Sequence, residues 1–209
     1  MKSAKALSEF IAHNSIKGFL AQDEAERLMD LAVQSAALGP VLEIGSYCGK
    51  STIYLGEACK QSGNSLFAVD HHRGSEEHQL GEEYHDSELY DAQIKRMDSL
   101  PTFRRSVYLA GLESTVIPIV ASSQQLAPLW AIPLGMVFVD GGHSDAAALF
   151  DCTEWAKHIV PGGILAVHDL FEHPEDGGQA PFNAFNAVLK TGQWELLPQV
   201  NSLGALRRK

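Results

Sequence analysis

The sequence predicts an α/β protein built on a parallel sheet. The main observation is a series of short, unbroken apolar runs, each bounded by Gly, Pro, Asp or Ser, at 41–44, 66–69, 116–120, 136–139 and 164–167. Such runs are typical of parallel strands that are buried on both faces. The second observation is that helix-length segments lie between them, as parallel crossover connections require. With 209 residues, of which 45% are hydrophobic, the chain suits a single domain.

Helices are predicted before, between and after these strands. Residues 3–13 and 22–37 form the first two, and Gly39 and Pro40 end the second. The remaining helices are predicted at 50–61, 87–100 with a continuation to 112, 124–129, 144–158 and 181–190. Two final strands, 194–197 and 203–206, are expected to pair antiparallel to each other. We therefore interpret residues 1–38 as helices packed on a core domain of residues 39–209.

Composition and charge argue against several function classes. The chain carries 16 Lys and Arg against 26 Asp and Glu, a formal net charge of −10, which repels phosphate backbones and anionic lipids. We therefore expect neither nucleic acid nor a membrane surface as the main partner. No apolar stretch approaches the roughly 20 residues that cross a bilayer, and residues 1–10 lack a signal-peptide core. Cys48, Cys59 and Cys152 form no close pair or metal motif, so a cytoplasmic location is expected.

A glycine turn follows the first predicted strand. The segment from Glu43 to Thr52, EIGSYCGKST, contains the end of a strand, a turn and the start of a helix. Glycines there let a ligand reach the backbone, and the free amides at the helix start favour electronegative groups. A dinucleotide dehydrogenase would need glycines two and five residues after Gly45, and a Walker phosphate loop would need one more residue between Gly45 and Gly49. Neither motif matches in full.

The pattern that does match is acidic-x-Gly-x-x-x-Gly, formed by Glu43, Gly45 and Gly49, with Asp70 at the end of the next strand. A carboxylate at that strand end can accept both hydroxyls of a ribose. This arrangement resembles the class I S-adenosylmethionine-dependent methyltransferases, with Tyr47 where the family usually has a middle glycine. A purely structural turn is the alternative.

The resemblance covers residues 20–209 and implies a Rossmann-like, doubly wound sheet of seven strands. The expected order is 3-2-1-4-5-7-6, with the seventh strand antiparallel. Pro118 lies in the third strand and lacks a ladder donor, which fits the edge position that this order gives that strand. The implied cofactor is S-adenosylmethionine. Its expected binding residues are Glu43, Gly45, Ser46, Tyr47, Gly49, Ser51, Asp70, His71, Ser122, Ser123 and Asp140.

Two further strand ends carry ionisable side chains. Asp140 and His143 follow the fourth strand, and His168 and Asp169 follow the fifth. In a doubly wound sheet these ends share one edge, so the side chains should converge with Asp70 although they are far apart in sequence. Aspartate and histidine can ligate a divalent ion. The alternative is that they only cap turns or bond locally.

This second pattern resembles the metal-dependent O-methyltransferases of the catechol, caffeoyl, sugar and macrolide types. The resemblance implies a metal site formed by Asp140, His168 and Asp169, and catalytic roles for Asp140 and His143. His143 stands where catechol-type enzymes have a general-base lysine, and a histidine suits proton removal from a hydroxyl. The expected ion is magnesium, manganese or zinc, although a histidine ligand disfavours magnesium.

The predicted function is therefore metal-assisted O-methylation of a hydroxyl on a small molecule. A metal-dependent hydroxylase or oxygenase, a non-catalytic binding protein and a nicotinamide oxidoreductase remain alternatives. The stretch 71–86 fits either a solvated insertion or a substrate lid. Within it, His71, His72 and Arg73 can bind an anionic substrate group or close the site. The sequence leaves open which acceptor is used and whether the chain forms a homo-oligomer.

Overall fold

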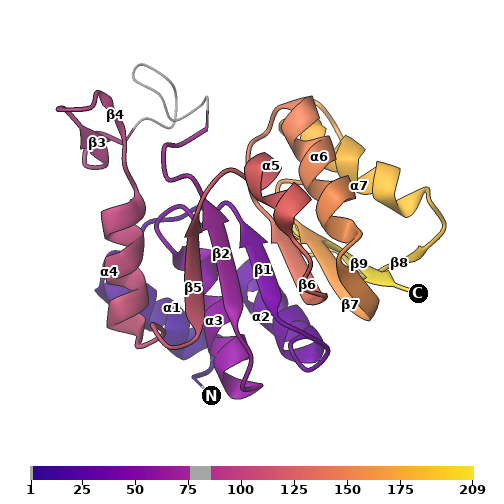
Figure 1. The fold of residues 1–209 in the computed structure, drawn as a ribbon, viewed down its shortest axis with the longest axis horizontal. Helices are drawn as coiled ribbons and strands as arrows, with labels where there is room; N and C mark the ends of the chain where they lie inside the picture. The colour runs from indigo at the N-terminus through magenta and orange to yellow at the C-terminus, as the bar shows by residue number, and fades with distance from the viewer. Residues whose placement is uncertain (1, 76–85) are drawn as a thin grey trace.

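A computed structural model describes residues 2–75 and 86–209. They form a seven-stranded sheet in the order β5-β2-β1-β6-β7-β9-β8 (Figure 1). The first five strands of this sheet along the chain are parallel, and β9 runs antiparallel to both β7 and β8. This is the predicted order, so the Rossmann-like α/β fold is confirmed. The strands are β1 Val41–Ile44, β2 Leu66–Asp70, β5 Val116–Val120, β6 Leu134–Val139, β7 Ile159–Val167, β8 Trp194–Leu196 and β9 Gly204–Arg208.

Helices cover both faces of the sheet, and each face has its own apolar cluster. One cluster joins the sheet to α1, α2, α3 and α4, and the other joins it to α5, α6 and α7 (Figure 1). Among the described helices, none is long and apolar enough to cross a membrane. The helices are α1 Ala4–His13, α2 Gln22–Ser35, α3 Lys50–Gln61, α4 Leu100–Ala110, α5 Ser123–Leu126, α6 Asp145–Ala156 and α7 Ala180–Leu189.

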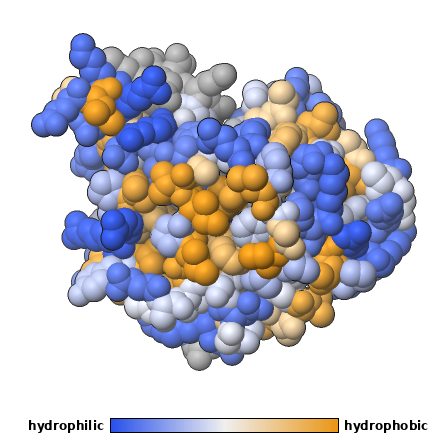
Figure 2. Space-filling model, in the orientation of Figure 1, coloured by the Kyte–Doolittle hydropathy of each residue, from blue (hydrophilic) through white to orange (hydrophobic). Residues whose placement is uncertain are grey.

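Among the strands of residues 2–75 and 86–209, β5 pairs only with β2 and forms one edge of the sheet. Pro118 therefore lies in an edge strand, as predicted. The next helix, α5, is a single turn followed by the 3₁₀ turn Ala127–Leu129, and the predicted helix 124–129 is split between them. Apolar side chains of β5 and of the residues after α5 are exposed, and Figure 2 shows an apolar patch in this region.

The helix predicted over 87–100 is wrong. This segment instead contains a short antiparallel pair, β3 Tyr90–Asp91 and β4 Arg96–Met97, and a helix begins only at Leu100. The Asp86 carboxylate accepts the backbone N–H of Glu88, and the Asp91 carboxylate accepts those of the two residues before Lys95. Such side-chain bonds compete with helix formation, and Lys95 has a φ of 53°, outside the helical region. Most of the predicted insertion 71–86 lies outside the described residues.

Candidate active site

The carboxyl ends of the parallel strands meet at one edge of the sheet and position the predicted site residues there. The glycine turn follows β1, Asp70 ends β2, Asp140 follows β6, and His168 and Asp169 follow β7. Backbone bonds extend the ladders past the strand ends: they run from Gly45 N to Val69 O, from Asp140 N to Ile44 O, and from His168 N to Val139 O. The predicted site residues at these strand ends thus lie at the same edge of the sheet.

The turn after β1 uses backbone conformations that favour glycine. Gly45 has a φ of 89° and Gly49, the N-cap of α3, a φ of 93°. A Cβ on Gly45 would lie 1.9 Å from the Asp140 carbonyl oxygen, so only glycine fits between β1 and the end of β6. Tyr47 has a φ of 45°, and the residue that replaces the expected middle glycine therefore still adopts a left-handed conformation.

Asp70 is bound to this turn. Its Oδ2 accepts the Tyr47 N–H at 2.8 Å, and its Oδ1 accepts the His72 N–H at 2.7 Å. The two bonds fix the carboxylate beside the glycine turn, while its side chain remains 15% exposed. His71 is more exposed, and its ring nitrogen lies 3.9 Å from Asp70. Asp70 is therefore held in place and still able to accept ligand hydroxyls.

Glu43 lies beneath the turn and is fully buried. Its Oε2 accepts the Thr52 hydroxyl at 2.6 Å, and burial raises the pKa of its carboxyl to about 7 although Ser51 and Thr52 favour the ionised form. Ser46, which is also buried, lies close enough to this carboxylate to favour its ionised form as well. Hydroxyl groups from the turn and from the start of α3 therefore hold the Glu43 carboxyl beneath the turn.

The segment after β5 was predicted to contact the cofactor, but its two serines face different ways. Ser122 caps α5 by accepting the Gln125 N–H at 3.2 Å. Ser123 is buried, and its hydroxyl donates to Asp151 Oδ1 of α6. The Ser123 side chain is therefore already engaged inside the fold, and Ser122 is the more accessible of the two.

Asp151 makes a pH-dependent contribution to stability. Burial raises the pKa of this carboxyl to about 6, against the opposing hydrogen bond from Ser123. Since the ordinary value is about 4, the ionised group costs the fold roughly 2–3 kcal/mol above pH 6 and nothing below pH 4. We expect Asp151→Asn to raise the free energy of unfolding by about 2 kcal/mol at pH 8 and to leave it unchanged at pH 4.

Urea unfolding at the two pH values measures this difference. Asp30→Asn, at an exposed position of α2, is the matched control and should have little effect at either pH. A loss of stability in Asp151→Asn at pH 8 would show that the ionised carboxylate stabilises the fold.

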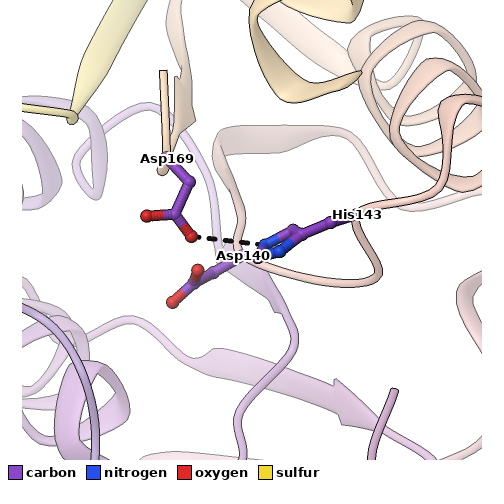
Figure 3. A group of neighbouring side chains, drawn as sticks. All are labelled: Asp140, His143 and Asp169. Carbon is purple, nitrogen blue, oxygen red and sulfur yellow. Dashed lines mark ion pairs between the residues drawn. The ribbon is translucent and has the colours of Figure 1, made fainter. Parts of the chain in front are cut away.

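A second group of ionisable side chains lies at the ends of β6 and β7. Asp140, His143 and Asp169 each offer one ligand atom, and these atoms all lie within 4.8 Å of one another (Figure 3). His143 Nε2 lies 3.2 Å from Asp169 Oδ2, and the two side chains are 34% and 27% exposed. Asp169 has a φ of 57°, in the left-handed region. The three side chains therefore lie close together, and His143 and Asp169 remain accessible to solvent.

His168, which was predicted as a metal ligand with Asp140 and Asp169, has both ring nitrogens close to carboxylates. Its Nδ1 lies 3.2 Å from Asp140 Oδ1, and its Nε2 lies 3.0 Å from Glu24 Oε2. Burial favours the neutral ring, but the Asp140 charge and the bonds to Asp140, Asp169 and Glu24 raise the pKa of His168 to about 12. Both ring nitrogens of His168 therefore face carboxylates, and His143 is the histidine whose ring is grouped with Asp140 and Asp169.

Glu24 is the residue that the sequence interpretation missed. It lies at the third position of α2, where its carboxylate also accepts the Ala21 N–H in a capping arrangement. Burial alone would raise the pKa of this carboxyl, but bonds from His168 and Ser202 hold it at about 2. An acid near a helix start is an ordinary capping signal. Nothing in the sequence indicates its partner, which lies 144 residues away.

A separate polar cavity of about 460 Å³ lies between the end of α1, α4 and residues 88–89. Lys17 faces it and is held by Asp86 at 2.5 Å and Glu88 at 2.6 Å. None of the predicted site residues lines this cavity. The cavity is lined by His13, Asn14, Ser15, Lys17, Glu88, Leu89, Thr102 and Arg105.

The strand order, the glycine turn and the acid at the end of β2 define a class I methyltransferase domain. Residues 42–170 match a family model described as a methyltransferase domain. Because this match spans more than half of the chain, the protein belongs to that methyltransferase family. The predicted enzyme class is confirmed, and the family assignment does not support a nicotinamide oxidoreductase.

Solved methyltransferases share the fold at low sequence identity. The SAH-bound methyltransferase PaMTH1 of Podospora anserina is 14% identical, with 100% of this chain and 89% of that chain covered and a TM-score of 0.68. The O-methyltransferase TomG of Streptomyces achromogenes, solved with SAM and involved in tomaymycin synthesis, is 16% identical, with 100% and 91% covered and a TM-score of 0.62. An O-methyltransferase of Bacillus cereus in complex with SAH is 16% identical, with 100% and 91% covered and a TM-score of 0.64.

Proposed function

We propose that the protein uses S-adenosylmethionine to methylate a hydroxyl oxygen of a small molecule. The observation that carries this proposal is that Asp70, at the end of β2, shares one edge of the sheet with the group formed by Asp140, His143 and Asp169. A cofactor whose ribose is bound by Asp70 then has its sulfonium end near the strand-end group. The net charge of −10 favours a small acceptor over a nucleic acid.

Two features of the turn support the cofactor. The close approach at Gly45 and the left-handed Tyr47 leave the backbone amides of the turn near Asp70. Beneath the turn, the buried Glu43 carboxylate accepts the Thr52 hydroxyl and so supports the start of α3. The solved methyltransferases with SAM or SAH bound share this fold.

His143 is the proposed general base. Its Nε2 lies 3.2 Å from Asp169, so the carboxylate can orient the ring and stabilise the imidazolium that forms when the acceptor loses its proton. On the side away from His143, the buried His168 ring lies with its Nδ1 3.2 Å from Asp140 and 3.4 Å from Asp169. Once the acceptor is deprotonated, methyl transfer is largely a matter of orientation between oxygen and sulfonium.

A metal-assisted form of the reaction is the second candidate, and the donor set supports it. Asp140, His143 and Asp169 fit a divalent ion, and an imidazole with two carboxylates suits manganese, zinc or iron better than magnesium. When bound, the ion would supply Lewis acidity that lowers the pKa of the acceptor hydroxyl. In this form His143 is a ligand, and another group or water takes the proton.

Asp70→Ala tests the cofactor half of the proposal. We expect the substitution to weaken SAH binding on the order of 100-fold. The reason is that the two ribose hydroxyls of SAH lose their hydrogen bonds to the Asp70 carboxylate. Isothermal titration calorimetry with SAH measures this change. Asp30→Ala, which removes an exposed acid from α2, should bind SAH as the wild type does.

Transfer of a labelled methyl group to a panel of hydroxylated, amine and thiol acceptors tests the chemical half. Product from hydroxylated acceptors, lost in Asp70→Ala, is the expected result. An unchanged SAH affinity in Asp70→Ala, or transfer to nitrogen or sulfur acceptors only, would contradict the proposal.

A further inference from the structure

A buried chain of polar contacts connects the N-terminal helix α2 to the strand-end group. The Glu24 and His168 side chains are 4% and 5% exposed, and they meet at 3.0 Å between Oε2 and Nε2. The other Glu24 oxygen accepts both the N–H of Ser202, at 2.9 Å, and its hydroxyl, at 2.8 Å. Glu24 is therefore bound on both sides and cannot move without breaking buried hydrogen bonds, each of which is costly to leave unpaired.

The opposite side of the His168 ring contacts both aspartates. Its Nδ1 lies 3.2 Å from Asp140 Oδ1 and 3.4 Å from Asp169 Oδ1, so one ring nitrogen bridges the ends of β6 and β7. The Asp140 and Asp169 carboxylates each have an oxygen within 4.8 Å of the other. Two negative charges this close repel each other unless a hydrogen-bond donor lies between them. The second Asp169 oxygen faces His143. The His168 ring therefore contacts both aspartates on the side away from His143, and Glu24 fixes the position of the ring.

We propose that Glu24 is a positioning residue of the active site, which acts through His168 to keep Asp140 and Asp169 at the spacing seen beside His143. The inference rests on the proposed function and extends the site to α2, which lies outside the family match at 42–170. Residues that bond a site's own side chains typically change metal affinity or activity by about 10–100-fold when they are replaced.

Asp23 provides a matched control on the same helical turn. Its Oδ2 accepts the Asn201 side-chain amide at 2.7 Å, so it docks α2 on the same 201–202 turn as Glu24 does. Among the described residues, Asp23 contacts Asn201 and the Glu24 amide, and it makes no hydrogen bond or ion pair with His168. Asp23→Asn therefore weakens helix docking and leaves the His168 bridge in place.

The experiment compares wild type, Glu24→Ala, Glu24→Gln and Asp23→Asn. We expect Glu24→Ala to lower kcat about 10–100-fold and to weaken Mn²⁺ binding, measured by electron paramagnetic resonance without substrate, by a similar factor. SAH affinity should stay within about 2-fold, because Asp70 is not affected. Glu24→Gln keeps an acceptor and the volume and should recover part of the loss. Asp23→Asn should change only thermal stability.

A readout independent of catalysis separates this inference from the proposed function. In NMR spectra, the buried Nε2–H of His168 should give a slowly exchanging ring signal that disappears in Glu24→Ala and persists in Asp23→Asn. Absent SAH binding in the wild type would overturn the proposed function, and the ring signal would still report on Glu24. Equal effects of Glu24→Ala and Asp23→Asn on the ring signal and on kcat, or no effect of Glu24→Ala on either, would overturn the positioning role.

Discussion

Gly45→Ala is expected to abolish SAH binding and to destabilise the fold by more than about 3 kcal/mol. The new methyl group would lie 1.9 Å from the carbonyl oxygen and 2.6 Å from the carbonyl carbon of Asp140, and both are backbone atoms that cannot rotate away. The ends of β1 and β6 must then separate. Since Asp140 N donates to Ile44 O at this point, the separation also breaks the bond that holds the two strand ends together.

Gly63→Ala is the matched control for the backbone contribution. Gly63 has a φ of 65°, but a Cβ there would meet nothing within 4 Å. Its replacement should cost only about 1 kcal/mol of conformational strain and leave SAH affinity unchanged. Urea unfolding and calorimetric SAH titration of both variants measure the difference. Equal stability losses with SAH binding intact would show that β1 and β6 do not approach each other as described.

His143→Ala should lower methyl transfer about 10²–10⁴-fold, the usual range for loss of a general base. The reason is that the ring held by Asp169 at 3.2 Å is the proposed proton acceptor at the strand ends. SAH affinity should change little, because the ribose-binding acid lies on β2. Steady-state kinetics and calorimetry on the same preparations give both quantities.

His143→Lys distinguishes a base from a metal ligand. Lysine can accept a proton at higher pH, so a base role predicts partial activity with an alkaline shift of the pH optimum. A lysine replaces an imidazole ligand poorly, so a ligand role predicts a loss of Mn²⁺ binding with no recovery at any pH. Normal turnover in His143→Ala would contradict both roles.

The fold was predictable where the signal is local. Buried parallel strands produce continuous apolar runs, and all five runs form strands of the sheet, while Pro118 correctly indicated the edge strand. The segment 87–100 was not predictable in the same way. Its helical pattern competes with turns made by Asp86 and Asp91, and the preference is decided by hydrogen bonds that composition does not reveal.

The candidate site likewise contains residues that a local sequence pattern predicts and residues that only tertiary contacts place. Asp70, Asp140, His143 and Asp169 could be found because parallel strands end at a common edge, which makes strand-end residues neighbours. The sequence could not decide which histidine faces the open side. His168 precedes Asp169 in the chain, but its ring turns inward because Glu24, from the distant helix α2, offers a buried partner. Contacts between residues so far apart depend on tertiary packing and have no local pattern.

A crystal structure with SAH bound tests the central claim most directly. The account predicts the ribose hydroxyls on Asp70, the homocysteine chain along residues 45–49, and the sulfur on the side of the site where Asp140 and His143 lie. SAH bound at another place, or with its sulfur directed away from His143, would contradict the account.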